Sequence, residues 1–246
     1  MISVLIFTGG LHPLKADFKR FIKRFAPPDF VIAADSGLVC AHRFGYTADL
    51  IVGDMDSLVP ASALDSYPEE KILRFKRDKD DSDTVIALKK AIAYPQSDPD
   101  KIVQCAQGNG TTYRREELFI ILCGGDGGRI DHLLGIAKQF ETPVYPDLWL
   151  CREQTVYNLR SGFDGTPRTL IIEARRCKEQ VSIFPVPTLH GDYRLCSQGL
   201  VWPLEKVDWH NGAFSLSNRA CDDYVLHKKD VVLTAEKGAF IVIVPY

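Results

Sequence analysis

Four short apolar runs in the first half of the sequence each lead into a turn that contains glycine or aspartate. The runs are built mainly from Val, Ile, Leu, Phe and Ala, and they cover residues 2–7, 29–34, 49–52 and 118–123. Stretches with apolar residues at helical spacing, 16–25 and 82–94, lie between them. Continuous apolar strands that alternate with helices are typical of a parallel sheet covered on both faces. The first half therefore predicts an α/β domain.

The pattern changes near residue 150. Later segments are short, often alternating, and separated by turn residues, and we expect strands at 155–159, 168–174, 180–186, 212–218, 222–229, 230–236 and 239–246. Many short strands at close spacing are typical of a β-sandwich or barrel. We expect an α/β domain at residues 1–150 and an all-β sandwich domain at 151–246. The polar stretch 94–117 is expected to be an inserted loop.

Composition argues against several classes of protein. The formal net charge is −2, so no global field indicates a nucleic acid or an anionic membrane as partner. Seven cysteines are scattered without a C-x-x-C pair, which is typical of reduced thiols in the cytoplasm and not of a zinc module. The first residues lack the features of a signal peptide, and no apolar run approaches the roughly 20 residues that span a bilayer. We expect a cytoplasmic protein.

Acidic residues follow the predicted strands of the first half directly. Asp35 follows the run 29–34, and Asp54 and Asp56 follow the run 49–52. The run 118–123 leads into "GGDGGRIDH", which carries Asp126 and Asp131. Because the carboxyl ends of parallel strands share one edge of a sheet, we expect these acids to converge there. The stretch "DKDDSD", residues 78–83, opens a predicted helix and could join them.

A cluster of carboxylates predicts a cation. Like charges at one site repel each other unless a cation lies among them, and oxygen ligands without His or Cys favour Mg²⁺ or Mn²⁺. The glycines of "GGDGGR" let backbone N–H groups approach an anion, and Arg129 can bind phosphate in a bidentate manner. Acids, a metal, a glycine-rich turn and an arginine together indicate phosphoryl chemistry.

Each motif also has a purely structural interpretation. "DSG" and "GDMDS" are good turn sequences, and in "DKDDSD" Ser82 or Asp81 can cap a helix. "GGDGG" matches neither the dinucleotide fingerprint nor a P-loop. His132 is typical of a structural hydrogen-bonding residue. Trp202 and Trp209 fit a core or an interface, although an exposed tryptophan could stack on a flat cationic ring.

The motifs "DSG", "GDMDS", "KDDSD" and "GGRIDH", followed by "SQGLVWPL" and "SLSN", together resemble the thiamine pyrophosphokinase family. The resemblance covers nearly the whole chain in the family's order. It implies a Rossmann-like α/β domain that binds nucleotide and Mg²⁺, followed by a β-sandwich that binds thiamine and dimerises. It also implies a homodimer with thiamine between the subunits.

The resemblance assigns roles residue by residue. Metal binding is expected at Asp54, Asp56 and Asp83. The catalytic set adds Asp80, Arg129 and Asp131. Nucleotide binding is expected at Asp35, Ser36, Gly37, Ser57, Lys79, Ser82, Gly125 and His132. Thiamine binding is expected at Ser215, Ser217, Asn218 and, for ring stacking, Phe240.

The implied reaction is transfer of the β,γ-diphosphoryl group of ATP to the hydroxyl of thiamine, with Mg²⁺ or Mn²⁺, giving thiamine diphosphate and AMP. Asp56 or Asp83 could receive the hydroxyl proton. Ser36 stands in place of a family glycine, Val85 differs from many bacterial members, and the 94–117 insert is long. These departures leave open a different alcohol acceptor such as a pterin. A second alternative is a non-catalytic ATP-binding regulator.

Overall fold

The structure of the protein is a computed structural model that describes residues 1–76, 80–93, 115–187 and 191–246. The chain divides into two units, Met1–Arg152 and Glu153–Tyr246. Strands and helices alternate in the first unit, whereas strands predominate in the second. The chain is therefore a mixed α/β protein.

The first unit is built on a sheet of six parallel strands in the order β6-β5-β1-β2-β3-β4. Their bounds are β1 Ile2–Phe7, β2 Phe30–Ala34, β3 Leu50–Gly53, β4 Ile72–Arg74, β5 Leu118–Cys123 and β6 Leu148–Leu150. The chain moves outward from β1 to β4 and then returns to the other side of β1 for β5. The loops after β1 and β5 thus lie at the point where the strand order reverses, which is where ligands bind in open α/β sheets.

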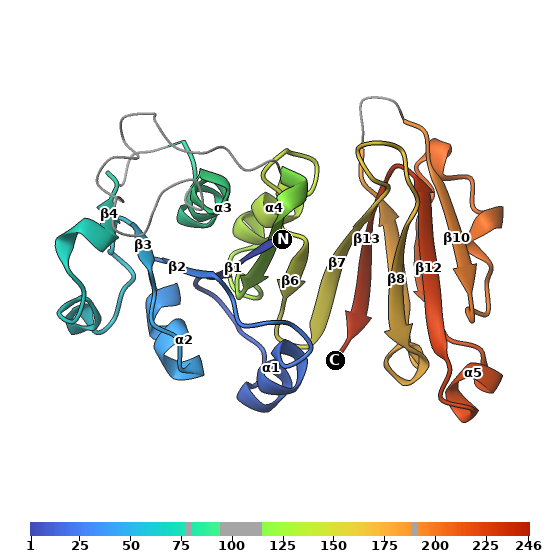
Figure 1. Ribbon diagram of the computed structural model, residues 1–246, viewed down its shortest axis with the longest axis horizontal. Helices are drawn as coiled ribbons and strands as arrows, with labels where there is room; N and C mark the ends of the chain where they lie inside the picture. Colours follow the sequence, from blue (N-terminus) through green and yellow to red (C-terminus); the bar gives the residue numbers. More distant parts are fainter. Residues whose placement is uncertain (77–79, 94–114, 188–190) are drawn as a thin grey trace. The chain divides into compact units, whose positions relative to one another are not determined.

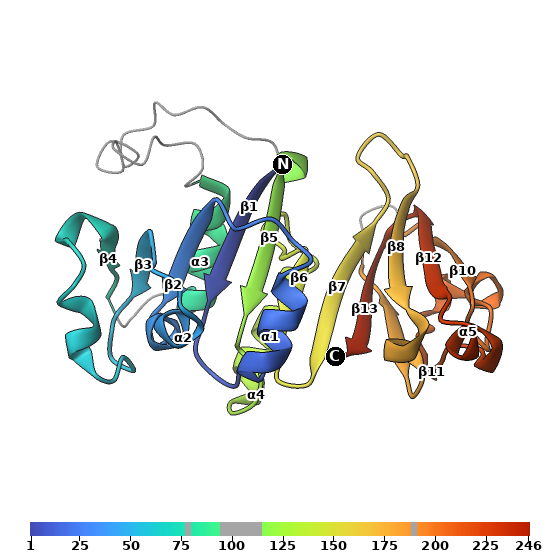
Figure 2. The same ribbon diagram turned by 60° about the horizontal axis from the view of Figure 1, so that its bottom comes forward.

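Helices lie on both faces of this sheet (Figure 1, Figure 2). Helices α1 (Lys15–Ile22) and α2 (Gly37–Phe44) lie on one face, and α3 (Asp83–Ala93) and α4 (Ile130–Gln139) lie on the other. Short 3₁₀ helices occur at Ala61–Leu64, Glu69–Lys71 and Arg115–Glu117. Because both faces are covered, the strands are mainly apolar, and residues 4–7 of β1 are fully buried.

The register of the sheet brings the carboxyl ends of its strands together. Phe7 at the end of β1 lies opposite Ala33 of β2 and Cys123 of β5, and Ala34 lies opposite Val52 of β3. The segments that follow β1, β2, β3 and β5 therefore leave the sheet at the same edge.

The second unit contains antiparallel strands in the orders β11-β9-β13-β7 and β10-β12-β8. Their bounds are β7 Gln154–Arg160, β8 Arg168–Glu173, β9 Val181–Pro185, β10 Arg194–Gln198, β11 Ser215–Asn218, β12 Asp230–Lys237 and β13 Ala239–Pro245. Short helices occur at α5 Asp222–Leu226 and, as 3₁₀ turns, at Ala174–Cys177, Leu204–Lys206 and Trp209–Asn211. Residues from both sets of strands share one apolar cluster that includes Leu233 of β12 and Val242 of β13.

Most of the predicted elements are present. The four apolar runs of the first half are strands, and the two helical stretches overlap α1 and α3. The strand predicted at 222–229 is wrong, because this segment forms α5. Asp222 and Asp223 lie in its first turn, where carboxylates interact favourably with the helix dipole. The sequence analysis missed the short strands β4, β6 and β10. Residues 94–114 of the insert predicted at 94–117 lie outside the described residues.

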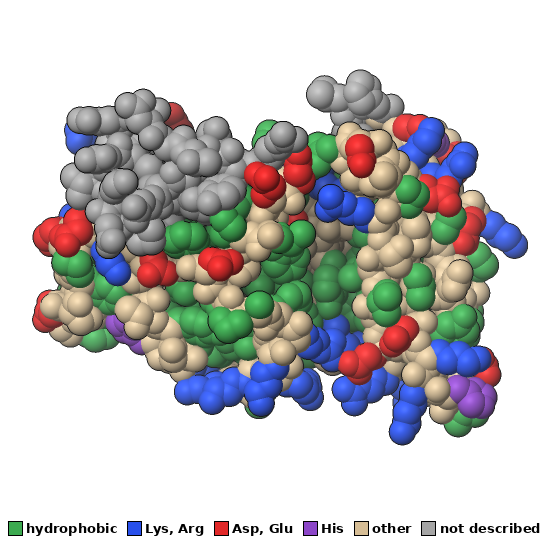
Figure 3. Space-filling view, viewed as in Figure 1, with side chains coloured by type: hydrophobic (Ala, Val, Ile, Leu, Met, Phe, Trp, Pro, Cys, Tyr) green, Lys and Arg blue, Asp and Glu red, His purple; other side chains and the backbone are tan. Residues whose placement is uncertain are grey.

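Charge is distributed unevenly on the surface. Lys and Arg side chains gather along the lower edge of Figure 3, where Figure 1 draws α1. Helix α1 carries the exposed Lys15 and Lys19, and the exposed Lys23 directly follows it. Among the helices described, none combines the length and the apolar character needed to cross a membrane.

Candidate active site

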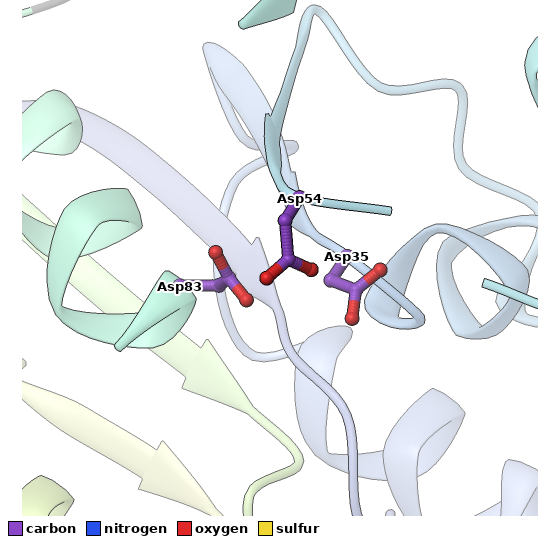
Figure 4. A group of neighbouring side chains, drawn as sticks. All are labelled: Asp35, Asp54 and Asp83. Atoms are coloured by element: carbon purple, nitrogen blue, oxygen red, sulfur yellow. The ribbon is translucent and has the colours of Figure 1, made fainter. Parts of the chain in front are cut away.

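Three aspartates from separate segments meet at the carboxyl edge of the parallel sheet. Asp35 directly follows β2, Asp54 directly follows β3, and Asp83 is the first residue of α3. One carboxylate oxygen from each lies within 4.8 Å of the others. The three side chains gather with Asp54 between Asp83 and Asp35 (Figure 4). We refer to Asp35, Asp54 and Asp83 as the acidic group.

The backbone around the acidic group adopts unusual conformations. Asp35 and Met55 have φ angles of 48° and 65°, a region that is uncommon for residues with a Cβ atom and is often associated with functional sites. Gly53 has a φ of 147°, and a Cβ atom there would lie 3.1 Å from the Cβ of Asp35. Glycine at this position therefore lets the segment after β3 approach the segment after β2 closely.

The "GDMDS" motif orients two members of the acidic group. The N–H of Asp56 donates to Asp54 Oδ1 at 3.2 Å, and the hydroxyl of Ser57 donates to Asp35 Oδ2 in a short hydrogen bond. Ser57 Oγ also lies 3.2 Å from Ser36 Oγ, which links the loop after β3 to the start of α2. Asp56 itself is exposed and is not a member of the acidic group.

Asp35 is the most buried member, with an exposed fraction of 7%. Burial raises its pKa, the Ser57 hydrogen bond opposes this rise, and the neighbouring charges of Asp83, Asp54 and Asp56 raise the pKa further. Asp35 Oδ1 is buried and has no hydrogen-bond partner among the described residues. A buried, unbonded carboxylate oxygen beside two other carboxylates matches the ligand set of a hard divalent cation, so these residues fit Mg²⁺ or Mn²⁺.

The stretch "DKDDSD" contributes Asp83 to this group but not its other described aspartates. Ser82 Oγ accepts the N–H of Val85 at 3.4 Å, as a helix cap does, and Asp81 forms an ion pair with Lys89. Asp80 was expected to share a helix face with Asp83. It precedes the helix, is exposed, and does not belong to the acidic group. Lys79 and Asp78 lie outside the described residues.

Three backbone N–H groups of the glycine-rich turn after β5 are bonded within the protein. The N–H of Gly125 donates to Gly9 O at 2.6 Å, that of Gly124 to Leu150 O at 3.1 Å, and that of Gly127 to Asp126 Oδ1 at 2.7 Å. A backbone N–H that is already bonded is not available to an anion. The N–H of Gly125 is therefore already used within the protein, and the expected role of Gly125 in nucleotide binding stays a prediction. A Cβ atom at Gly125 would lie 2.4 Å from Ile136 Cδ1, so glycine permits close packing against α4.

Arg129 and Asp131 pair with each other on the surface. Their side chains approach to 2.6 Å and 3.1 Å, and both are exposed, as is His132. The pairing lowers the pKa of Asp131 and raises the pKa of Arg129. Asp131 was expected to complete the acidic cluster, but it is not part of the acidic group.

Gly37 begins α2 beside the end of β1. A Cβ atom there would lie 2.2 Å from Phe7 O, so any larger residue would push the helix away from the strand. The glycine thus holds Ser36 and Asp35 near the sheet. This is a structural reason for a residue that the sequence analysis assigned to nucleotide binding.

The predicted thiamine residues in the second unit differ in accessibility. Ser215 is half-buried and Ser217 is exposed. The amide of Asn218 is fully buried, donates to Trp202 O at 2.8 Å, and accepts the N–H of Trp202 at 3.2 Å. Phe240, which was expected to stack on thiamine, has a fully buried ring that packs edge-on against Trp209 at 5.3 Å.

Sequence reasoning missed Thr8 and His12, which follow β1. The hydroxyl of Thr8 is 2.6 Å from that of Thr84, and His12 Nε2 is 2.6 Å from Thr8 O. Burial lowers the pKa of His12. The available signal was the same one that revealed Asp35 and Asp54, namely polar residues placed directly after an apolar strand.

The family model described as the catalytic domain of thiamin pyrophosphokinase matches residues 22–148, a range that contains the whole acidic group. The chain belongs to this family. It is accordingly an enzyme of the thiamin pyrophosphokinase type. A comparison with curated proteins gives no match.

Solved structures of thiamin pyrophosphokinases share the fold. A family member from Enterococcus faecalis is 20% identical with a TM-score of 0.64, and the alignment covers 100% of this chain and 99% of that chain. The thiamin pyrophosphokinase of Candida albicans is 16% identical with a TM-score of 0.64, covering 100% of this chain and 89% of that chain. The thiamin pyrophosphokinase of Geobacillus thermodenitrificans is 20% identical with a TM-score of 0.61, and the alignment covers 100% of this chain and 98% of that chain.

The raised pKa of Asp35 predicts a pH-dependent cost in the metal-free enzyme. The folded protein keeps the Asp35 proton at a pH where the unfolded chain has released it, so the free energy of unfolding falls as pH rises between the unfolded and folded pKa values. In EDTA, Asp35→Asn should be more stable than the wild type at neutral pH. The difference should shrink as pH falls toward the ordinary pKa of an aspartic acid. Urea unfolding across this pH range measures it.

Excess Mg²⁺ should reverse the order, because it stabilises the wild type and has a weaker site in the variant. Asp65→Asn, which removes an exposed carboxylate of the same unit, is the control for loss of one charge. Equal stability of Asp35→Asn and wild type at every pH, with and without Mg²⁺, would contradict the account.

Proposed function

We propose that this enzyme transfers the β,γ-diphosphoryl group of ATP to the hydroxyl of thiamine, giving thiamine diphosphate and AMP. The observation that carries the proposal is the convergence of Asp35, Asp54 and Asp83 from three separate segments within a region matched by the catalytic-domain family model. Convergent carboxylates at the edge of a parallel sheet suit a metal–triphosphate complex. A different acceptor or a purely regulatory role is not favoured by the family match.

The acidic group would hold Mg²⁺. Asp54 and Asp83 are partly exposed and can offer oxygens outward. The buried Asp35 has one oxygen held by Ser57, and its other oxygen has no hydrogen bond to any residue that the structure describes. The chemistry that Mg²⁺ supplies when bound at such a site is neutralisation of charge on the phosphate oxygens of ATP. Asp35 therefore replaces Asp56 in the proposed set of metal ligands.

The transfer itself requires position and a proton acceptor. The thiamine hydroxyl oxygen forms a bond to the β-phosphorus, the bond from that phosphorus to the α–β bridging oxygen breaks, and AMP leaves. We assign the hydroxyl proton to Asp56, because it is exposed and close enough to the acidic group to raise the pKa of Asp35. Arg129 is exposed at the start of α4, and it could exchange its contact with Asp131 for a phosphate oxygen.

We propose that thiamine binds through the second unit. Trp202 is 56% exposed, whereas Trp209 is buried, and Asn218 holds the backbone of Trp202 through two hydrogen bonds. A cationic aromatic ring such as the thiazolium of thiamine can stack on an exposed indole. Trp202 thus takes the stacking role that the sequence analysis gave to Phe240, with Ser215 and Ser217, in the same strand as Asn218, as polar contacts.

We further propose the Rossmann-like and β-sandwich architecture for residues 1–150 and 151–246, and a homodimer with thiamine at the subunit interface. Support for the dimer comes from exposed apolar side chains of the second unit, among them Trp202, Phe214 and Leu216. A cytoplasmic location is supported by the cysteines in the described residues, all of which are free thiols.

The reaction predicts AMP formation that depends on thiamine. Purified enzyme with ATP and Mg²⁺ should release AMP only after thiamine is added, and EDTA should stop the release. Asp54→Asn and Asp83→Asn should each lower kcat/KM by a factor on the order of 10² to 10³, because each removes a preorganised charge at the triphosphate. Chromatography of AMP and thiamine diphosphate measures both products.

Asp65→Asn is the control for these variants and should keep wild-type kcat/KM. The proposal fails if AMP appears at the same rate without thiamine, or if both Asp54→Asn and Asp83→Asn retain full turnover while folded.

The stacking role of Trp202 predicts that its removal weakens thiamine binding selectively. Trp202→Ala should raise the KM for thiamine about tenfold, which corresponds to a cation–π contact of about 1.4 kcal/mol, while the KM for ATP stays unchanged. Trp202→Phe should keep most of the affinity because an aromatic face remains. Steady-state kinetics with each substrate varied in turn measures this.

Phe163→Ala removes another exposed aromatic ring of the same unit and serves as the matched control. Unchanged thiamine KM in Trp202→Ala would remove Trp202 from the thiamine site.

A further inference from the structure

The segment that follows β1 carries a buried polar residue for which the proposed chemistry gives no role. Thr8 directly follows β1 and is only 4% exposed. Its Oγ1 lies 2.6 Å from Oγ1 of Thr84, a residue 76 positions away in the sequence. Thr84 is the neighbour of Asp83 in the first turn of α3. This hydrogen bond therefore joins the central strand of the sheet to the turn that carries one member of the acidic group.

The backbone of Thr8 is held from several sides. Its N–H donates to Cys123 O of the adjacent strand at 3.0 Å, and its carbonyl oxygen is 2.6 Å from His12 Nε2. The next residue, Gly9, accepts the N–H of Gly125 at 2.6 Å. These hydrogen bonds fix the backbone that carries the Thr8 hydroxyl, at the point where the strand order reverses.

Asp83 lies in the first turn of α3, before the buried face of the helix begins. The buried apolar face of α3 starts at Val85, whereas Asp83 and Thr84 are only partly buried. The cap that Ser82 provides is local and does not attach this turn to the sheet. In addition, the charges of Asp54 and Asp83 act unfavourably on Asp35, so electrostatic repulsion favours outward movement of the first turn. A contact between Thr84 and the sheet opposes that movement.

We propose that Thr8, acting through its hydrogen bond to Thr84, is a positioning residue that fixes Asp83 in the acidic group for binding of the divalent cation. This inference rests on the proposed function, since it assumes that the acidic group binds a metal. Thr8 does not touch the metal or the substrates in this account. It sets the distance between Asp83 and the carboxylates of Asp35 and Asp54, as residues behind metal ligands commonly do.

The test measures metal binding in the absence of ATP and thiamine. Binding of Mn²⁺ to the full-length protein is followed by the loss of the free Mn²⁺ signal in electron paramagnetic resonance. Thr8→Val and Thr84→Val keep the branched shape but remove the hydrogen bond, and each should raise the Mn²⁺ Kd about tenfold, within the range seen when a residue behind a metal ligand is removed. Thr8→Ser keeps the hydroxyl and should restore the Kd to within about twofold of wild type.

The double variant Thr8→Val/Thr84→Val separates positioning from folding. Both singles leave one hydroxyl without its partner, while the double removes both partners and so recovers thermal stability. Because both changes break the same hydrogen bond, the Mn²⁺ Kd of the double should equal that of the singles. A Kd that returns to the wild-type value together with stability would overturn the proposal.

A matched control exists in the second unit. Thr169 and Thr234 form a similar hydroxyl pair, at 3.1 Å, between β8 and β12. Thr169→Val should leave the Mn²⁺ Kd unchanged.

The outcome also distinguishes this inference from the proposed function. If Asp54→Asn and Asp83→Asn bind Mn²⁺ as tightly as wild type, the acidic group is not the metal site and both ideas fail. If those variants lose Mn²⁺ while Thr8→Val binds it like wild type, the metal site stands and only the role of Thr8 is overturned.

Discussion

Mutual repulsion among three carboxylates held at one edge of a rigid sheet is the constraint on which the rest of this structure depends. One carboxylate oxygen each of Asp35, Asp54 and Asp83 lies within 4.8 Å of the others, and burial prevents water from screening Asp35 fully. Such an arrangement has a free-energy cost in the metal-free protein. The surrounding fold supplies the stability that keeps the three side chains together.

The parallel sheet provides the stability that offsets this repulsion. Residues 4–7 of β1 are fully buried between β2 and β5, and the register places the following segments at one edge. Close backbone approaches at Gly37 and Gly53 bring those segments nearer than side chains would allow. Hydrogen bonds from Ser57 to Asp35 and from Asp56 N–H to Asp54 then fix the carboxylate orientations. The strand register, the close backbone approaches and these hydrogen bonds together keep the three carboxylates from moving apart.

The sequence predicted the elements whose signals are local and repeated. The apolar runs of β1 and β5 were predicted residue for residue, and the rule that acids follow strands located Asp35 and Asp54. Where two local signals compete, prediction was weaker. Residues 222–229 contain Tyr and Val, which suit a strand, but the acidic pair Asp222 and Asp223 starts a helix. Three-residue strands such as β6 are too short to show a period.

Tertiary contacts could not be predicted from the same patterns. Nothing local distinguishes Phe240, which is buried beside Trp209, from an aromatic residue that is open to a ligand. Likewise, the glycines of "GGDGG" suggest an anion cradle until Gly9 is seen to accept the N–H of Gly125. In "DKDDSD", α3 begins at Asp83, and only the tertiary contact of Asp83 with Asp35 and Asp54 separates it from Asp80 and Asp81, which precede the helix.

The most direct test of the central claim is anomalous diffraction from crystals soaked in MnCl₂. The account predicts one Mn²⁺ peak coordinated by carboxylate oxygens of Asp35, Asp54 and Asp83, with no need for nucleotide. Absence of a peak among these three residues, at a Mn²⁺ concentration that saturates binding in solution, would contradict it.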